Sequence, residues 1–352
     1  MQIIAIFVKN LTSGGAEKQS ILLAKALAKN FQIHYIIFNG DKIHQKYMYM
    51  LQEDKRIKIA TFIGNHFKRY RSFLTYIKKN HIEAIFSYLT AANTYACIAG
   101  KQTGIKVYTG LRNAELPPIK CFVDKILTNT FCQKAICNCF SGANNFISKG
   151  FNKSKITVIP NCFENISPYK EKKETDLIHI ITVGRFVKQK DYETAIKSIA
   201  QLIKTNANII FEIVGYGELE MEIRNWIDKY QIKNNTHIYI NPDNIPKLLE
   251  EAHIYLSTSL FEGTSNSIME GMNANLPIVA TNVGDNYKLV RHNLNGFLCE
   301  KQSEKEIAFY LEKLVSDTEL RKKMGKQSKN LLEEEYSMEK FREKYIELLI
   351  RQ

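Results

Sequence analysis

The sequence predicts an α/β protein built from two doubly wound domains, each with a mostly parallel sheet. Three observations lead to this prediction. The 352 residues are more than one ordinary hydrophobic core accommodates. Short apolar runs alternate with helical stretches along the chain, as in repeated βα units. The alternation stops at an exposed, charged segment near 165–174 and then starts again, which indicates a linker between two domains.

Apolar runs bounded by turn residues predict the strands, and amphipathic stretches predict the helices. In the first half we expect strands at 3–8, 33–38, 84–87, 106–109, 135–139 and 155–159, with helices at 16–29, 66–79 and 91–100. In the second half we expect strands at 177–183, 209–214, 237–240, 254–256 and 277–280, with helices at 192–204, 243–251 and 304–352.

Composition narrows the class of protein. No uninterrupted apolar stretch approaches the roughly 18 residues needed to span a bilayer, and residues 2–8 begin a strand pattern without a basic leader. We therefore expect a cytoplasmic protein. The seven cysteines are scattered among apolar neighbours, which favours buried thiols over a metal cluster. The net charge of +13 requires an acidic partner, and nucleic acid, anionic lipid and a phosphate-bearing substrate all qualify.

Two glutamates, Glu262 and Glu270, lie eight positions apart around a Gly-Thr-Ser-Asn-Ser loop. The apolar run at 254–256 precedes this loop as a buried strand, and Ser265 or Asn266 can cap the helix that begins there. Backbone N–H groups at a helix start bind phosphate, and carboxylates accept hydrogen bonds from hydroxyls. The pattern therefore predicts a sugar-nucleotide pocket, whereas two isolated glutamates would more often be solvated surface acids.

Glycines and cations follow other predicted strands. Gly14 and Gly15 separate the first strand from the first helix, where glycine lets the backbone approach a ligand closely. The spacing there is that of neither a dinucleotide fingerprint nor a P-loop. Arg185 and Lys190 lie between a strand end and a helix start, a position that suits neutralisation of a diphosphate leaving group. Taken alone, they would be read as ordinary surface cations.

These motifs occur in the order found in glycosyltransferase family 4, and the chain resembles that family of retaining enzymes with the GT-B fold. The resemblance rests on Gly14-Gly-Ala-Glu17, Arg-Asn at 112–113, Ile-Pro-Asn at 159–161, Gly-Arg and Lys within 184–190, Val-Gly-Tyr-Gly at 214–217, and the two glutamates. It implies a Rossmann-like acceptor-side domain at 1–166 and a Rossmann-like nucleotide-sugar domain at 167–336. It also implies a helix at 337–352 that crosses back to the first domain.

The resemblance also implies roles for particular residues. Glu262 would face the donor sugar, and Arg185 and Lys190 would hold the pyrophosphate during catalysis. Donor binding is implied for Gly14, Gly15, Gly215, Tyr216, Ile240, Gly263, Thr264, Ser265, Asn266, Ser267, Ile268 and Glu270.

The loop at 109–118 follows a strand end, so Arg112, Asn113 and Glu115 are expected on the acceptor side of the cleft. Many relatives carry a histidine in this loop, and this chain has Arg112-Asn113 instead, which resembles a sub-group of the family. The Arg112 guanidinium can hold a diphosphate or a carboxylate through its fork of donors. It can equally tie down the loop.

The expected activity is retaining transfer of a hexose from a nucleotide sugar, a UDP-sugar by preference, to a hydroxyl of a lipid-linked saccharide. O-antigen, capsule or glycoprotein-glycan assembly would use such a reaction. The chain contains no Asp-x-Asp triplet, so the sequence does not suggest a metal ion that binds the diphosphate. We expect no cofactor besides the nucleotide sugar, which is a co-substrate. Two alternatives remain: an epimerase or phosphorylase on the same fold, and a basic nucleic-acid-binding or regulatory module supported by net charge alone.

One basic segment bears on membrane binding. Residues 66–79 interleave Lys and Arg with Phe73, Leu74 and Ile77, as in an amphipathic helix that lies on an anionic bilayer. The same pattern fits a solvated helix that packs through those apolar residues. With the net charge, it makes the inner face of the plasma membrane an expected partner of a peripheral protein, and nucleic acid is not expected.

Overall fold

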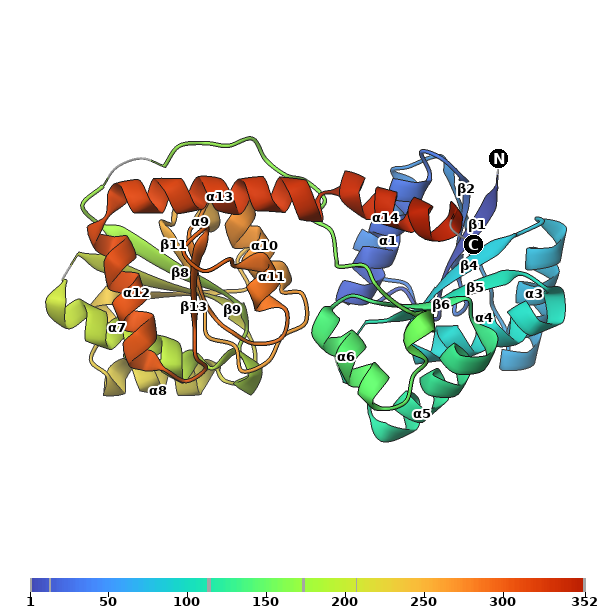
Figure 1. The fold of residues 1–352 in the computed structure, drawn as a ribbon, viewed down its shortest axis with the longest axis horizontal. Coiled ribbons are helices and arrows are strands. Elements are labelled where there is room, and N and C mark those ends of the chain that lie inside the picture. Colours follow the sequence, from blue (N-terminus) through green and yellow to red (C-terminus); the bar gives the residue numbers. More distant parts are fainter. Residues whose placement is uncertain (1, 13, 113–114, 173–174, 207, 351–352) are drawn as a thin grey trace. The chain divides into compact units, whose positions relative to one another are not determined.

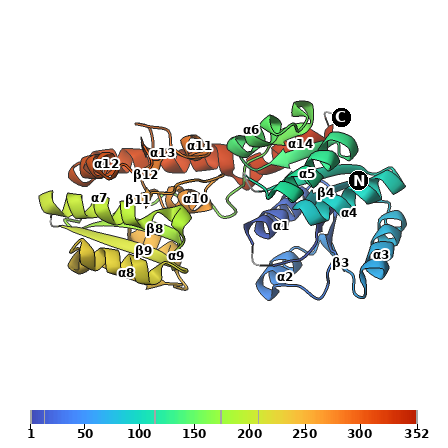
Figure 2. The same cartoon turned by 90° about the horizontal axis from the view of Figure 1, so that it is seen from below.

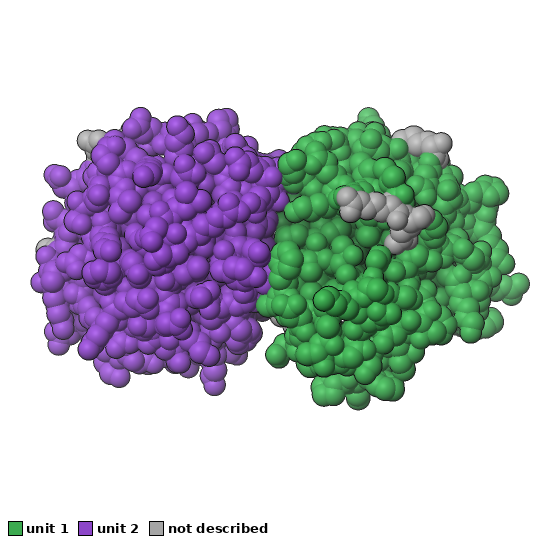
Figure 3. Space-filling view, viewed as in Figure 1, with its two compact units in different colours: residues 1–164, 338–352 green, residues 165–337 purple. Residues whose placement is uncertain are grey.

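The computed structural model describes residues 2–12, 14–112, 115–172, 175–206 and 208–350. The chain divides into two compact units, one of residues 1–164 and 338–352 and the other of residues 165–337 (Figure 3). The sequence-based boundaries lie at 166/167 and 336/337, and those of the structure lie at 164/165 and 337/338.

The described part of the first unit contains one parallel sheet of seven strands, in the order β3-β2-β1-β4-β5-β6-β7 (Figure 1). The strands are β1 (Ile3–Val8), β2 (Gln32–Ile37), β3 (Ile57–Thr61), β4 (Ala84–Tyr88), β5 (Lys106–Leu111), β6 (Lys134–Cys137) and β7 (Ile156–Val158). The helices are α1 (Gly15–Leu27), α2 (Gln45–Gln52), α3 (His66–Lys79), α4 (Thr90–Thr103), α5 (Pro118–Ile126), α6 (Phe140–Ser148) and α14 (Met338–Ile350).

Both faces of this first sheet are buried, which explains the continuous apolar runs of its strands. Along β1, Ile4 and Ile6 point to a core shared with α1, α2 and α14, whereas Ala5 and Phe7 point to a second core on the opposite face. Helices α3, α4 and α6 cover that second core (Figure 2). The ring of Phe73 from α3 stacks on Phe7 at 4.4 Å between centroids.

The described part of the second unit contains a parallel sheet of six strands, in the order β10-β9-β8-β11-β12-β13. The strands are β8 (Ile178–Arg185), β9 (Ile209–Tyr216), β10 (Thr236–Ile240), β11 (Ile254–Ser257), β12 (Ile278–Thr281) and β13 (Gly296–Cys299). The helices are α7 (Tyr192–Thr205), α8 (Glu220–Lys229), α9 (Ile245–Glu251), α10 (Asn266–Asn273), α11 (Asn286–Leu289), α12 (Glu304–Ser316) and α13 (Thr318–Tyr336).

The second unit's largest core cluster joins β8, β9 and β11 to helices α7, α8 and α12. In each unit the strand order reverses beside the first strand, because β1 lies between β2 and β4 and β8 lies between β9 and β11. In doubly wound sheets, ligands bind outside the carboxyl ends of the strands at such a reversal. The topology therefore predicts ligand sites at the carboxyl ends of β1 and β4 in one unit and of β8 and β11 in the other.

The alternation of strands and helices predicted from the sequence is confirmed, and so is the doubly wound parallel class. The short strands β3 and β13 and the helices α2, α5, α6 and α11 were not predicted. All seven cysteines are buried, as expected. Among the described residues, none of the helices combines the length and the apolar character that crossing a bilayer demands.

Candidate functional site

The predicted catalytic residues of the second unit gather at the carboxyl edge of its sheet. Arg185 is the last residue of β8 and is exposed, and Lys190 lies five residues further on, just before α7. Glu262 lies in the loop that joins β11 to α10. Because β8 and β11 are neighbouring strands, the two loops that follow them meet.

A short ion pair joins two of these residues. Lys190 Nζ lies 2.6 Å from Glu262 Oε1, and the two side chains are only 17% and 9% exposed. The same carboxylate oxygen accepts a hydrogen bond of 2.8 Å from the Ser259 hydroxyl. Charge-assisted bonds at low exposure hold a side chain in one geometry, so the carboxylate of Glu262 has a fixed position.

Further bonds tie the two loops together. The Thr258 hydroxyl lies 2.9 Å from the carbonyl oxygens of both Lys190 and Asp191. The Gln189 amide donates to the Phe261 carbonyl at 2.8 Å, and the Leu260 N–H donates to the Gln189 carbonyl at 2.8 Å. The loop that carries the cations and the loop that carries Glu262 are therefore linked by backbone and side-chain bonds. Sequence reasoning had selected neither Ser259 nor Gln189.

The predicted helix start lies next to Glu262. Helix α10 begins at Asn266 with Ser265 at the N-cap position. The Ser265 side chain makes no capping hydrogen bond and instead lies 3.3 Å from the Ser267 hydroxyl. The first ladder bond runs from the Met269 N–H to the Ser265 carbonyl, so the N–H groups of 266–268 precede it. Such a helix start suits an anion.

The other donor-side candidates of this unit lie around the same strand ends. Gly263 and Thr264 belong to the loop before α10, Ile268 is buried, and Glu270 lies one turn inside the helix. Gly215 and Tyr216 end β9, where the Tyr216 carbonyl accepts from the Phe186 N–H at 2.7 Å. Ile240 ends β10 beside Gly215. Tyr216 and Ile240 are exposed.

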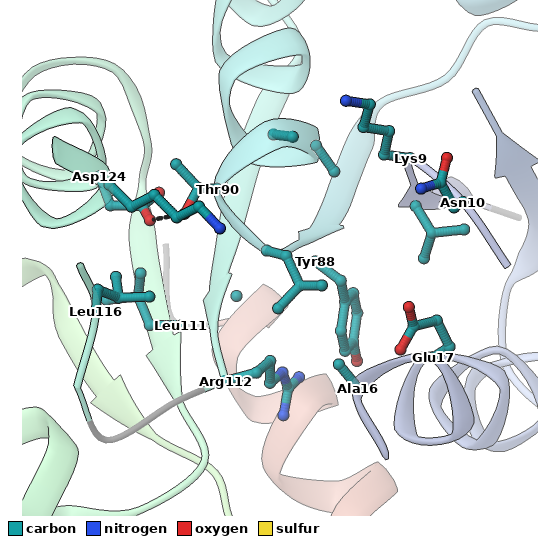
Figure 4. Close-up of a pocket in the computed structure, with 16 residues that line it drawn as sticks. Lys9, Asn10, Ala16, Glu17, Tyr88, Thr90, Leu111, Arg112, Leu116 and Asp124 are labelled. Carbon is teal, nitrogen blue, oxygen red and sulfur yellow. Dashed lines mark hydrogen bonds between the residues drawn. The ribbon is translucent and has the colours of Figure 1, made fainter. Parts of the chain in front are cut away.

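The remaining candidates lie in the first unit. Gly14 is the N-cap of α1 and Gly15 is its first residue. Arg112 follows β5 and is buried, whereas Glu115 is exposed on the same loop. Asn113 lies outside the described residues. A cavity of about 290 Å³ lies at the carboxyl edge of the first sheet, and Ala16, Glu17 and Arg112 are among the residues that line it (Figure 4).

Arg112 has two aromatic neighbours that the sequence did not indicate. Its guanidinium carbon lies 4.3 Å from the centre of the Tyr88 ring, and its Nη2 donates to the Tyr345 hydroxyl at 3.0 Å. Tyr88 ends β4, and Tyr345 comes from α14 at the far end of the chain. Burial raises the pKa of Tyr88 well above 10, so the ring that faces the cation is neutral. A separation of 233 positions leaves no local signal for this contact.

Comparison with solved structures identifies the class of fold. The chain aligns over 100% of its length, and over 100% of the other chain, with the crystal structure of Anabaena Alr3699/HepE in complex with UDP. The TM-score is 0.85 at 18% sequence identity. This likeness, with two parallel Rossmann-like sheets, shows the GT-B fold that the sequence motifs implied.

Sequence comparison identifies the family. Residues 164–331 match the model of the family described as glycosyl transferases group 1. An uncharacterised glycosyltransferase of Haemophilus influenzae is 27% identical, covering 98% of this chain and 99% of the relative. A Campylobacter jejuni enzyme is 23% identical, with 99% and 98% covered; it is named GalNAc-alpha-(1->4)-GalNAc-alpha-(1->3)-diNAcBac-PP-undecaprenol alpha-1,4-N-acetyl-D-galactosaminyltransferase. The second unit is thus a glycosyl transferases group 1 domain, and the chain is a glycosyltransferase.

Proposed function

We propose that this glycosyltransferase moves a hexose from a UDP-sugar to a hydroxyl of a lipid-linked saccharide, with retention at the anomeric carbon and without a metal ion. The observation that carries the proposal is the ion pair of Lys190 with Glu262 just before the start of α10, at the sheet edge where Arg185 ends the neighbouring strand β8. The UDP complex of Anabaena HepE supports the choice of nucleotide. The PP-undecaprenol acceptor named for the Campylobacter relative supports a lipid-linked acceptor.

In this reaction the bond between the anomeric carbon and the diphosphate oxygen breaks, and a bond to the acceptor oxygen forms. The proton of the acceptor hydroxyl passes to the departing diphosphate. Negative charge grows on the diphosphate as it leaves, so fixed cations and a helix start lower the barrier. Arg185 and Lys190 supply the cations, and Glu262 accepts hydrogen bonds from the sugar while its ion pair with Lys190 keeps it in place.

Nucleotide selectivity tests the donor assignment. Thermal shifts would be recorded with UDP, GDP, ADP and NAD for the native protein and for Glu270→Ala. We expect the largest shift with UDP and its loss in the variant, because the resemblance to glycosyltransferase family 4 implies that Glu270 binds the nucleotide ribose. A protein that no nucleotide stabilises would contradict the proposal and favour a binding module. Sugar release from donor alone, or dependence on phosphate, would favour an epimerase or a phosphorylase.

A lipid-linked acceptor brings the protein to a membrane surface, and the structure changes our choice of the contacting helix. The apolar residues Phe73 and Ile77 of the predicted segment 66–79 are at most 1% exposed and belong to the core. Segment 66–79 is therefore a solvated helix that packs on the protein core through its apolar residues. Its only described large apolar residue that is mostly exposed is Phe67.

Helix α5 carries a more suitable surface. Ile119, Phe122 and Ile126 are 81%, 64% and 43% exposed, and their spacing of three and four places them on one face. Lys120 and Lys125 come from the same helix. An apolar stripe with adjacent lysines fits an anionic bilayer, because the rings enter the interface and the cations meet acidic headgroups. We assign membrane contact to α5.

Vesicle flotation tests this assignment. Phe122→Asp should reduce binding to vesicles of mixed phosphatidylglycerol and phosphatidylcholine about tenfold. The substitution removes an apolar side chain that would enter the bilayer and adds a negative charge that the anionic headgroups repel. Phe67→Asp is the matched control, because it places the same change on an exposed phenylalanine of α3. Equal losses in both variants, or binding unaffected by the anionic lipid content, would contradict the assignment to α5.

A further inference from the structure

We propose that the cavity of the first unit binds a phosphoryl group of the acceptor, with the Arg112 guanidinium as its main contact. The inference deepens the proposed function and rests on it, because it specifies the chemistry of the acceptor: a substrate that carries phosphate or diphosphate beside the hydroxyl that is glycosylated. The evidence is a buried cation with unused donors, a helix start beside it, and the charges that line the rest of the cavity.

The first observation is the state of Arg112. Its side chain lines the cavity and the residue is only 7% exposed. Nη2 bonds to Tyr345, but neither Nε nor Nη1 has a hydrogen-bond partner among the described residues. Arginine stays charged in proteins, and a buried charge without an anion is costly. The unused Nε and Nη1 donors point to different sides of the guanidinium, so each can donate to a separate oxygen of an anion that carries several, such as a phosphoryl group.

The second observation is the start of α4, which reaches the same cavity. Thr90, Ala91 and Ala92 line it, and the first ladder bond of the helix runs from the Asn93 N–H to the Leu89 carbonyl at 2.9 Å. The N–H groups of 90–92 therefore precede the ladder and can meet an anion. The N-cap residue Leu89 contributes no side-chain cap.

Backbone strain accompanies this helix start. Leu89 has φ of 71°, a conformation that residues other than glycine rarely adopt, and it lines the cavity. Strained residues of this kind are costly to the folded state and concentrate where a ligand is bound. In this case the strained turn directs the start of a fourteen-residue helix toward the cavity.

The remaining charges of the cavity fit an acceptor that is anionic at one end and hydroxylated elsewhere. Lys9 and Lys120 also line it, as do the carboxylates of Glu17 and Asp124. Asp124 accepts from the Thr90 hydroxyl at 2.6 Å and from the Asn93 amide at 3.0 Å, so protein donors already satisfy it. Glu17 accepts from Thr12 at 2.7 Å. Neither carboxylate forms an ion pair with Arg112 among the described contacts.

A purely structural role for Arg112 is the competing explanation. Its bond to Tyr345 connects β5 to α14, and this bond alone would justify an arginine. The bond occupies one nitrogen, however, and leaves two donors directed elsewhere. Tyr345→Phe removes the structural bond and keeps the guanidinium, so it is the variant that separates the two roles.

The experiment is calorimetric titration of the full chain with inorganic pyrophosphate, in the presence of saturating UDP so that the donor site of the second unit is occupied. Arg112→Gln should lower the affinity at least about tenfold, because a charged hydrogen-bond donor is lost. Arg112→Lys should recover part of that loss, since it restores the charge but not the separate donors of the guanidinium. Tyr345→Phe should bind pyrophosphate within about threefold of the native protein.

Other outcomes would overturn the proposal. These are unchanged binding in Arg112→Gln, equal losses in Arg112→Gln and Tyr345→Phe, elimination of native binding by UDP, or tighter binding of a dicarboxylate such as succinate. If UDP does not bind at all, the proposed function fails instead. The pyrophosphate titration is then done without nucleotide in Arg185→Ala, which removes a cation of the second unit, and the same comparison of Arg112 variants applies.

Discussion

The two sheet edges hold their cations in opposite ways. In the second unit, Lys190 is paired with Glu262 at 2.6 Å, and the loops around them are bonded to each other. In the first unit, Arg112 is more deeply buried than Lys190, yet two of its nitrogens have no partner among the described residues. The charge of Lys190 is neutralised within the protein, so its site needs no ligand for charge balance. The charge of Arg112 has no such partner in the described part of the chain, and we infer that an anion from outside supplies it. The contrast predicts that substitutions at the two edges have different consequences for stability and binding.

The largest expected effect is on transfer at the second edge. Arg185→Ala and Lys190→Ala should each lower kcat about 10²–10³-fold, as is typical for loss of one preorganised charge contact. Only Lys190→Ala should also lower Tm, because it leaves the Glu262 carboxylate buried without its cation. Radiolabelled transfer and thermal melts measure both quantities.

Lys188→Ala is the matched control for these variants, since Lys188 is exposed on the same turn and forms no ion pair among the described residues. If Arg185→Ala kept full transfer activity, the leaving-group assignment would be wrong. If Lys190→Ala melted at the native temperature, the ion pair would not stabilise the site.

A second test compares one glycine in each unit. Gly284 has φ of 55°, and a Cβ built there would lie 1.9 Å from the Glu262 carbonyl oxygen. Gly104 has φ of 77°, and nothing lies within 4 Å of its Cβ position. Gly104→Ala should cost about 1 kcal/mol, from the left-handed backbone alone. Gly284→Ala should cost about 3 kcal/mol or more and reduce activity, because it must displace the loop that holds Glu262.

Urea unfolding and the transfer assay check this pair of variants. Similar unfolding free energies for Gly104→Ala and Gly284→Ala, with activity kept in both, would mean that the Glu262 loop is not constrained in the way described.

The smallest expected effect is a difference in pH dependence between the units. Burial, assisted by Lys58, lowers the pKa of His34 in the first unit to about 4. The unfolded chain then binds the extra proton below about pH 6.5, so this group removes about 1 kcal/mol of stability on acidification to pH 5.5. In the second unit, the hydrogen bond to Glu212 raises the pKa of His179. Its contribution is complete below about pH 6.5 and is lost as the pH rises through the raised value.

Hydrogen exchange resolved by peptide, at pH 5.5 and pH 7.5, measures each unit separately. Exchange is compared after correction for its intrinsic pH dependence. His34→Gln should make the first unit less sensitive to acid, and His179→Gln should remove the advantage of the second unit at low pH. Identical pH responses in native protein and variants would count against both assignments.

The two edges also differ in how far the sequence revealed them. Arg185, Lys190, Glu262 and Glu270 lie in short contiguous motifs after apolar strands, so their convergence followed from the rule that neighbouring parallel strands end at one edge. The environment of Arg112 could not be predicted in this way. Its partner Tyr345 is 233 positions distant, and the positive φ of Leu89 occurs at a residue type that gives no sign of it.

Elements were missed for similar physical reasons. Strand β3 is an edge strand of five residues in which only Ile57 and Ala60 are buried, and its apolar signal is correspondingly weak. The segment 66–79 shows the converse: its amphipathic pattern was detected correctly, but periodicity does not say whether a face meets lipid or core. Only the stacked contact of Phe73 on Phe7 decides that.

The bond between Arg112 and Tyr345 has a consequence for biosynthesis. The core of the first unit includes Phe341 and Tyr345 of α14, which the ribosome makes after the whole second unit, and the second unit is contiguous at 165–337. Domains generally fold as units while the chain emerges. The unit whose synthesis starts first therefore waits for α14, and the unit made second is the first to reach its complete native set of contacts.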